Sequence, residues 1–225
     1  MEAEVDFGDV HVKLRGELTK LTLFCFRLSY SGKAAHRIAA TGGQEAFFEG
    51  HAHAFRVLGG IPVGKIRYDN LKSAVDQVIG FSRLREEAER WTAFRSHYGF
   101  DAFYCQPGIQ GAHEKGGVEG QIGWYRRNHL VPLPEVDSIA ELNAMVDAWD
   151  VDDEQRRIGS RPHTVGEYFA IEQNGDINTV AAANRDPRFW EAPGEYRIER
   201  DNKHSLGWGY GVHGCVGRVL ATSEA

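Results

Sequence analysis

Residues 63–70 read Val-Gly-Lys-Ile-Arg-Tyr-Asp-Asn, and the interpretation of the whole chain starts from this stretch. The run from Val63 to Tyr68 predicts a short β-strand, and Asp69 follows it directly, where Asn70 ends the run. Ligands and catalytic groups in open α/β sheets collect at the carboxyl ends of strands. A carboxylate at position 69 is therefore well placed for chemistry.

Strands and helices alternate in the pattern on both sides of this stretch. Residues 4–14 and 18–30 predict a hairpin of long strands, joined at Arg15-Gly16-Glu17. Apolar residues at helical spacing predict further helices, and a second short strand follows one of them. The predicted helices cover residues 44–58, 83–97, about 114–128 and a segment from 138, and the strand covers 100–105. This order predicts a mixed α/β sheet flanked by helices.

The composition is that of a globular protein, with 42% hydrophobic and 26% charged residues among 225. No window approaches about 18 consecutive apolar residues, so we expect no membrane contact. The first residues are acidic and do not predict a secretory signal. Cys25, Cys105 and Cys215 are far apart and form no CxxC pair, which favours a reducing cytoplasm.

The net charge is −6, and the residues before Thr179 carry all of it, because the remainder holds six basic and six acidic residues. Binding to DNA phosphates depends largely on Lys and Arg. Two interpretations follow: a basic domain is missing, or DNA is not the substrate.

Two further acids stand in contexts like that of Asp69. Asp6 follows Glu4-Val5, and Glu119 follows Gly116-Gly117-Val118. Carboxylates are the ligands of Mg²⁺ and Mn²⁺, and two such ions about 3.5–4 Å apart can promote phosphoryl transfer. Taken singly, the aspartates read as turn formers and Glu119 as a solvated helical residue. Together, Asp6, Asp69 and Glu119 predict one site for two Mg²⁺ or Mn²⁺ ions.

Residues 4 to about 172 resemble the catalytic core of DDE transposases of the IstA type, which share the retroviral-integrase fold. The resemblance implies an RNase H-like fold with Asp6, Asp69 and Glu119 as metal-binding acids. It also implies DNA (insertion-sequence ends and target) as the substrate, with a helper ATPase and a homo-oligomer as further partners. The matching segments are Val5–Gly8, Leu28–Ser31, Ala54–Phe55, Gly59–Pro62, Tyr68–Val75, His97–Phe100, Glu114–Glu119 and, downstream, Pro132–Glu172.

The predicted helix around Glu119 also carries cations. Lys115, Glu119 and Arg126 are four and seven residues apart and project from one face, which suits contact with a DNA phosphate. A Lys115–Glu119 ion pair is the equally weighted alternative. Asn70, beside Asp69, is the third predicted DNA-binding residue. His51 and His53 are two apart and point away from each other on a helix, so we do not expect a zinc pair there.

The last 47 residues have a different character. Trp208–Gly217 resembles the haem-ligand loop of cytochrome P-450 enzymes, with Cys215 in the position of the thiolate ligand. The remainder of that fold is absent from the sequence, so haem binding is not expected. The predicted organisation is a catalytic core at 1–130, a helical segment at 131–178 and an irregular haem-loop fragment at 179–225.

Three functional hypotheses remain open. The first is a metal-dependent transposase or integrase core, which we expect to be N-terminally truncated and impaired because IstA-type chains carry DNA-binding helices ahead of the core. The second is a remnant of a haem-thiolate monooxygenase. The third is a non-catalytic fragment that joins intact transposase.

Overall fold

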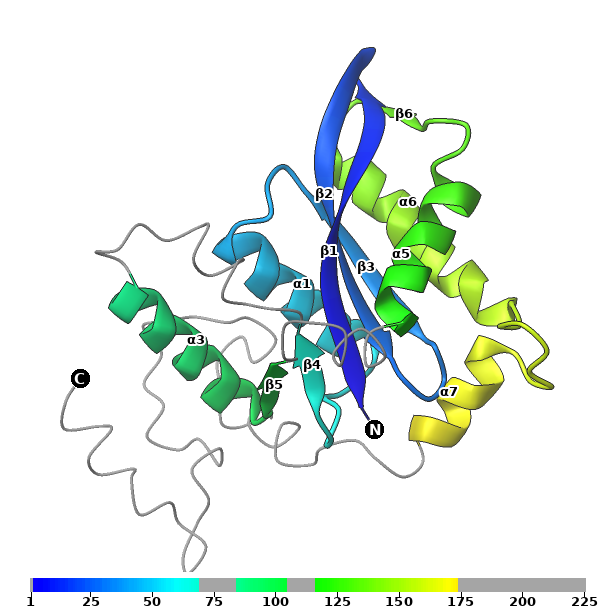
Figure 1. Cartoon of the computed structure of the whole chain (residues 1–225). Helices are drawn as coiled ribbons and strands as arrows, with labels where there is room; N and C mark the ends of the chain where they lie inside the picture. Colours follow the sequence, from blue (N-terminus) through cyan, green and yellow to red (C-terminus); the bar gives the residue numbers. More distant parts are fainter. Residues whose placement is uncertain (1, 69–83, 105–115, 174–225) are drawn as a thin grey trace, which may run out of the picture.

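A computed structural model describes residues 2–68, 84–104 and 116–173. At its centre is a sheet with strand order β3-β2-β1-β4-β5, and β6 pairs with β1 (Figure 1). The strands are β1 (Ala3–Leu14), β2 (Glu17–Leu28), β3 (Ala34–Ala39), β4 (Ile66–Tyr68), β5 (Ala102–Tyr104) and β6 (Glu135–Val136). The helices are α1 (Gln44–Val57), α3 (Leu84–Tyr98), α5 (Gly116–His129), α6 (Ile139–Asp152) and α7 (Val165–Gln173), with a short 3-10 helix η1 (Asp153–Gln155).

The predicted hairpin is confirmed. β1 and β2 pair antiparallel from Ala3↔Leu28 to Leu14↔Glu17. The two turn residues, Arg15 and Gly16, have φ angles of 53° and 82°, and positive φ at both central residues is typical of a tight hairpin turn. β4 and β5 join on the other side of β1 in parallel. The predicted mixed α/β sheet is therefore also confirmed.

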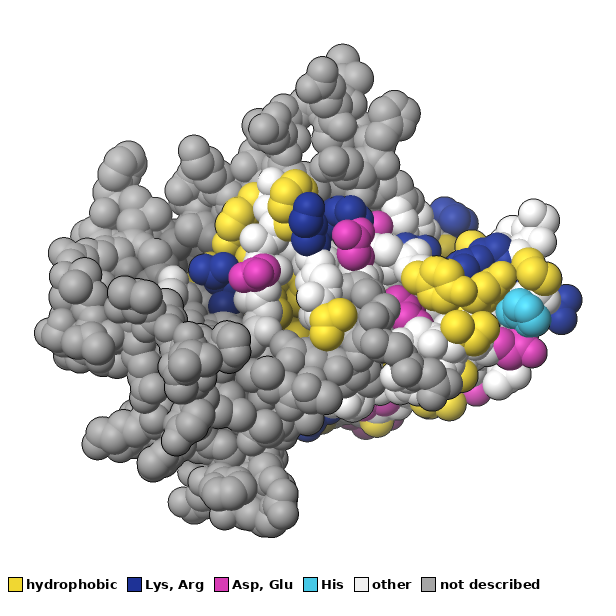
Figure 2. Space-filling view, turned by 90° about the horizontal axis from the view of Figure 1, so that it is seen from below, with side chains coloured by type: hydrophobic (Ala, Val, Ile, Leu, Met, Phe, Trp, Pro, Cys, Tyr) yellow, Lys and Arg dark blue, Asp and Glu magenta, His cyan; other side chains and the backbone are white. Residues whose placement is uncertain are grey.

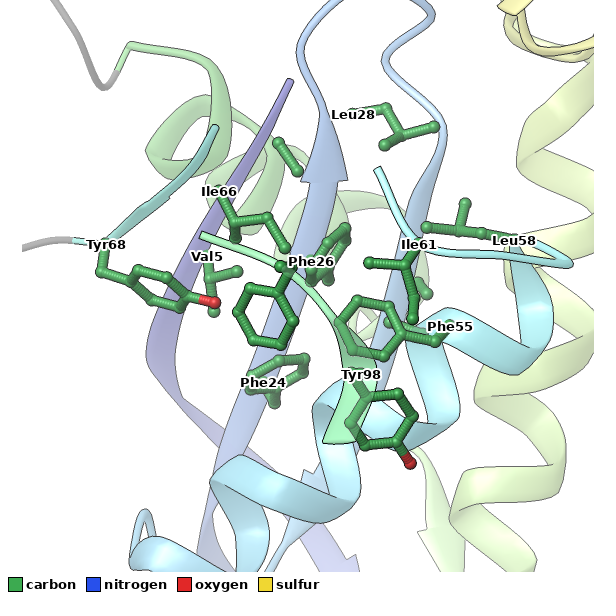
Figure 3. Packing of buried hydrophobic residues seen from close by; sticks show 14 of the residues in the cluster. Val5, Phe24, Phe26, Leu28, Phe55, Leu58, Ile61, Ile66, Tyr68 and Tyr98 are labelled. Atoms are coloured by element: carbon green, nitrogen blue, oxygen red, sulfur yellow. The ribbon is translucent and has the colours of Figure 1, made fainter. Parts of the chain in front are cut away.

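Alternation along the hairpin divides the buried residues into two layers. Val5 and Phe26 point to the face covered by α1 and α3, where aromatic side chains dominate (Figure 3). Val10 and Val12 belong to the second cluster, which α5 and α6 complete with residues such as Leu142. Burial of each large apolar side chain stabilises the fold by about 1.5–3 kcal/mol. Helices thus pack on both faces of the sheet.

One buried histidine lies within the aromatic layer. Its two ring nitrogens lie 2.7 Å from the carbonyl oxygen of Phe47 and 2.9 Å from the hydroxyl of Tyr68. This residue is His51, and burial lowers its pKa to about 3, so the ring is neutral at ordinary pH. His51 is therefore a polar member of the core. His53 lies elsewhere on α1, 3.2 Å from the carboxylate of Asp147.

The outer edge of β3 is covered by α6. Asn143 accepts a hydrogen bond from the amide of Ile38 and donates one to its carbonyl oxygen, each at 2.8 Å. Two turns further along α6, the carboxylate of Asp150 accepts a hydrogen bond from the amide of His36 at 2.7 Å and lies 2.6 Å from the ring Nδ1 of the same histidine. Because buried backbone groups need partners, these two side chains complete the hydrogen bonding of an edge strand.

Burial disfavours the charged form of His36, but the adjacent Asp150 carboxylate outweighs this effect and raises the pKa of His36 to about 10. Both side chains are buried, at 0% and 4% exposure. The core beneath α6 therefore contains an imidazolium–carboxylate pair.

Several strands differ from the sequence prediction, among them β3, which was not predicted. β4 spans only Ile66–Tyr68 instead of 63–68, because Val63 and Gly64 form a bend before the strand. β6 was not predicted: two prolines come just before it, and its pairing with Lys13 and Leu14 depends on the distant hairpin. Short strands of this kind are determined by tertiary contacts more than by local pattern.

Candidate active site

Asp6 lies in the middle of the sheet, on the long strand β1. Its carboxylate accepts the amide of Phe7 at 2.8 Å, and the side chain is half-buried. Side chains alternate along a strand, so Asp6 shares a face with Glu4 and Gly8. Both of these neighbours contact α5. The face of β1 that carries Asp6 is therefore the one covered by α5.

The strand that precedes Asp69 lies directly beside Asp6. β4 pairs with β1 in parallel, with Tyr68 as the partner of Val5. Asp6 follows Val5 in the sequence, and Asp69 follows Tyr68. Asp69 and Asn70 themselves lie outside the described residues. Their predicted roles stay predictions.

The helix that carries Glu119 packs closely on β1. The amide of Val118 donates a hydrogen bond to Glu4 at 2.8 Å. One turn later, a Cβ atom added to Gly8 would lie 2.7 Å from Ile122, so the helix packs directly against the backbone of the strand at that point. These two contacts bracket Asp6 on the strand and Glu119 on the helix. The structure thus brings two of the three predicted acids onto facing elements.

Glu119 itself is in the first turn of α5 and is exposed. In the described part of the chain, no three His, Cys, Asp or Glu side chains form a group that could hold a metal ion. The predicted set includes Asp69, which lies outside that part.

Arg126 lies on the same helix as Glu119 and is half-buried. Its Nη2 atom would be 2.8 Å from a Cβ at Gly8, so the guanidinium group crosses β1 two residues beyond Asp6. The pKa of Asp9 is lowered mainly by the hydrogen bond from Lys20, and the charge of Arg126 lowers it further. Lys115 lies outside the described residues, so its ion pair with Glu119 and its DNA contact both remain predictions.

Figure 2 views the end of the molecule on which the chain starts. Among the coloured residues on this face, Lys and Arg side chains are interspersed with Asp and Glu instead of forming one basic area. A second group, rich in hydrophobic side chains, lies on the side of α7. There Arg161 stacks on Tyr168 at 3.9 Å and donates to the carbonyl of Tyr30 at 2.7 Å.

The sequence interpretation missed Glu4. This acid is 7% exposed, and buried glutamates are rare unless they are paired. The signal was available: Glu4 and Asp6 are two residues apart on a predicted strand and therefore share one face. The sequence interpretation instead took Glu4 as part of the context of Asp6 and of the acidic first residues that do not predict a secretory signal.

The remaining predicted sites lie outside the described part of the chain. Cys215 and the predicted haem-loop fragment fall within residues 174–225, so haem binding stays untested. Of the helices that the structure describes, none is long and apolar enough to cross a membrane.

Comparison with known proteins agrees with the transposase resemblance. No protein-family model matches the chain. Over 175 residues it is 34% identical to the transposase for insertion sequences IS1326/IS1353 of Pseudomonas aeruginosa, a match that covers 76% of this chain and 33% of the relative. A further match, to cytochrome p450 CYP199A2 of Rhodopseudomonas palustris, is 47% identical over 45 residues, or 20% of this chain and 11% of the relative.

A chain of the simian T-cell lymphotropic virus intasome, solved in complex with PP2A regulatory subunit B56 gamma, has a similar fold. The TM-score is 0.50 at 16% sequence identity, over 75% of this chain and 53% of the other. The predicted RNase H-like fold, a mixed sheet flanked by helices, is confirmed. The chain spans about a third of the length of the transposase relative that it matches. In sequence this protein is similar to insertion-sequence transposases, and in fold it is an RNase H-like α/β domain.

Proposed function

We propose that this chain is the catalytic core of a metal-dependent DNA transposase, with Asp6, Asp69 and Glu119 as its metal-binding acids. One observation carries the proposal: β1, which holds Asp6, pairs in register with the strand that ends next to Asp69 and packs against the helix that holds Glu119. The 34% identity to an insertion-sequence transposase supports the same reaction class.

The carboxylates suit Mg²⁺ or Mn²⁺, which prefer oxygen ligands. When bound, two such ions supply charge stabilisation at the attacking and leaving oxygens of an in-line displacement. The proposed reaction is attack by water or a 3′-hydroxyl on a DNA phosphodiester. A new phosphorus–oxygen bond forms and the bond to the 3′-oxygen of the cleaved strand breaks. The attacking oxygen gives its proton to solvent, and the leaving 3′-oxygen takes one up to become a hydroxyl.

The residues of the chain would act by position and charge. Asp6 sits on a rigid central strand, which limits its movement, and Glu119 approaches from the exposed first turn of α5. Arg126 is on α5, and its guanidinium lies beside Gly8, two residues beyond Asp6 on β1, where it would bind a DNA phosphate. Lys115 and Asn70 are proposed to extend this contact. A helper ATPase and a second copy of the chain are the proposed protein partners.

Strand transfer tests the proposal. The chain is incubated with pre-cut insertion-sequence end DNA, a target plasmid and Mn²⁺. We expect joined products from the wild type, and at least a hundredfold less from each of Asp6→Asn, Asp69→Asn and Glu119→Gln. Asp9→Asn is the matched control, since Asp9 lies on the same strand, is exposed, and pairs with Lys20 at 2.7 Å. Full activity in an Asp6 or Glu119 variant would contradict the proposed site.

The same assay separates catalysis from simple association. A wild-type chain that binds intact transposase and lowers its activity, but joins no ends in Mn²⁺, would favour a non-catalytic partner of the transposase. In that case the carboxylate variants would inhibit as strongly as the wild type.

A further inference from the structure

Glu4 is a buried acid for which the proposed reaction has no direct use. Its Oε2 accepts the amide of Val118 at 2.8 Å, and its Oε1 accepts the hydroxyl of Ser29 at 3.4 Å. The side chain is 7% exposed. Both carboxylate oxygens therefore have protein partners, one of them in the helix that carries Glu119.

The bond from Val118 is of a kind that stabilises the start of a helix. The first amides of a helix have no partner within it, and their partial positive charge favours a carboxylate. Val118 is the third residue of α5. Glu4 satisfies this amide from another element, so the bond fixes where α5 begins relative to β1.

The backbone of the helix approaches Glu4 closely at Gly117. A Cβ atom at Gly117 would lie 2.6 Å from Glu4 Oε2. Arg27, the strand partner of Glu4 in β2, lies against the same position. Since Gly117 precedes Val118 and Glu119 directly, the contact determines the height and rotation of the first turn of α5.

We propose that Glu4 is a positioning residue that sets the distance between Asp6 and Glu119. It lies two residues from Asp6 on the same face of β1, and its hydrogen-bond partner is the residue next to Glu119. Glu4 acts through the backbone of α5 and contacts neither DNA nor metal. The inference rests on the proposed function, because it assigns a role to Glu4 within the same site.

The effect expected from this arrangement is on metal affinity. Mutation of a residue that orients a metal ligand typically lowers metal affinity or activity 10–100-fold. Loss of the Glu4–Val118 bond frees the first turn of α5, so that Glu119 spends less time within reach of an ion shared with Asp6. Saturating Mn²⁺ should restore most of the rate, because Glu119 itself remains present.

Glu4→Ala and Glu4→Gln distinguish positioning from other roles. The glutamine retains a side-chain oxygen that can accept the Val118 amide, whereas alanine does not. We expect Glu4→Ala to raise the Mn²⁺ concentration for half-maximal strand transfer about 10–100-fold, with a maximal rate near that of the wild type. Glu4→Gln should shift it less than about fivefold, and Asp9→Asn should leave it unchanged.

Two measurements that need no activity accompany the assay. Titration calorimetry follows Mn²⁺ binding, and hydrogen exchange follows the amide of Val118, which should exchange at least tenfold faster in Glu4→Ala. Thermal unfolding checks that each variant is folded, and if the alanine variant is not, Glu4→Asp, whose shorter side chain withdraws the carboxylate from the Val118 amide, takes its place in both measurements. Unchanged Mn²⁺ affinity in folded Glu4→Ala would overturn the inference. An equal loss of Mn²⁺ affinity in Glu4→Gln and Glu4→Ala would also overturn it, because it would indicate that Glu4 binds the metal itself.

The outcomes also separate this inference from the proposed function. A wild type that binds no Mn²⁺ and joins no DNA ends contradicts both. A wild type that does both, with a Glu4→Ala variant of equal metal affinity, contradicts only the role of Glu4.

Discussion

Replacement of Asp150 by alanine should destabilise the protein more than a change at any exposed acid of α6. The carboxylate of Asp150 holds two groups of His36, the backbone amide at 2.7 Å and the ring Nδ1 at 2.6 Å. Both side chains are buried, so water cannot replace the lost oxygen atoms. Alanine would leave a buried amide of an edge strand and a buried imidazole without their partner.

The magnitude follows from these contacts. Removing one member of a buried ion pair costs about 3–5 kcal/mol, because the partner stays buried without compensation. The free energy of unfolding of a typical domain is only about 5–15 kcal/mol. Asp147→Ala is the matched control on the same helix. Its carboxylate is 48% exposed where it meets His53 and Arg37, so about 0–1 kcal/mol is expected.

The pH dependence gives a second signature. The pKa of His36 is raised to about 10 in the folded protein from 6.5 as its ordinary value. The stabilisation is therefore complete below pH 6.5 and is lost as the pH rises through 10. Urea unfolding at pH 7 and pH 9.5 should show a decline for the wild type and a smaller decline for Asp150→Ala. A loss of less than about 1 kcal/mol in the free energy of unfolding of Asp150→Ala would refute the buried charged pair. So would a decline in stability between pH 7 and pH 9.5 as large in this variant as in the wild type.

Two further predictions concern the aromatic layer. In Gly50→Ala the new Cβ would lie 2.5 Å from the ring of Phe24, and the overpacking cost of about 1–3 kcal/mol should exceed the helix-propensity gain of about 1 kcal/mol. Urea unfolding should therefore show that this variant is less stable than the wild type. The control Gly120→Ala, which has open space around the new Cβ, should be more stable. The pKa of His51 is lowered to about 3, so its contribution is present above pH 6.5 and is lost as the pH falls toward 3. Acid titration of stability should therefore be shallower in His51→Gln, and an identical acid limb would contradict a neutral His51.

The elements with strong local signals were predictable from the sequence. The hairpin had long β-rich runs and a turn at Arg15 and Gly16, and α1 had a clear helical period closed by glycines. β3 and β6 had no such signal. β3 owes its edge position to Asn143 and Asp150, which are more than 100 residues away in the sequence. Contacts of that separation cannot be read from a local pattern.

The candidate site was predictable in part for the same reason. Asp6 could be placed on a strand and Glu119 on a helix, but no local pattern shows that α5 packs on β1. That packing brings the backbone at Gly8 and Gly117 close to side chains of the facing element, and the buried carboxylate of Glu4 bonds the first turn of the helix. The sequence interpretation treated these residues as context for the acids, whereas the structure makes them the contacts between the two elements.

The covered edge of β3 restricts how copies of this protein can assemble. The backbone amide and carbonyl of Ile38 and the amide of His36 are already bonded to α6, so a strand from another molecule cannot pair with these groups. An open edge at this position would allow the sheets of two copies to join. Contact between copies would have to use other surfaces, and each copy would keep its own sheet intact at β3.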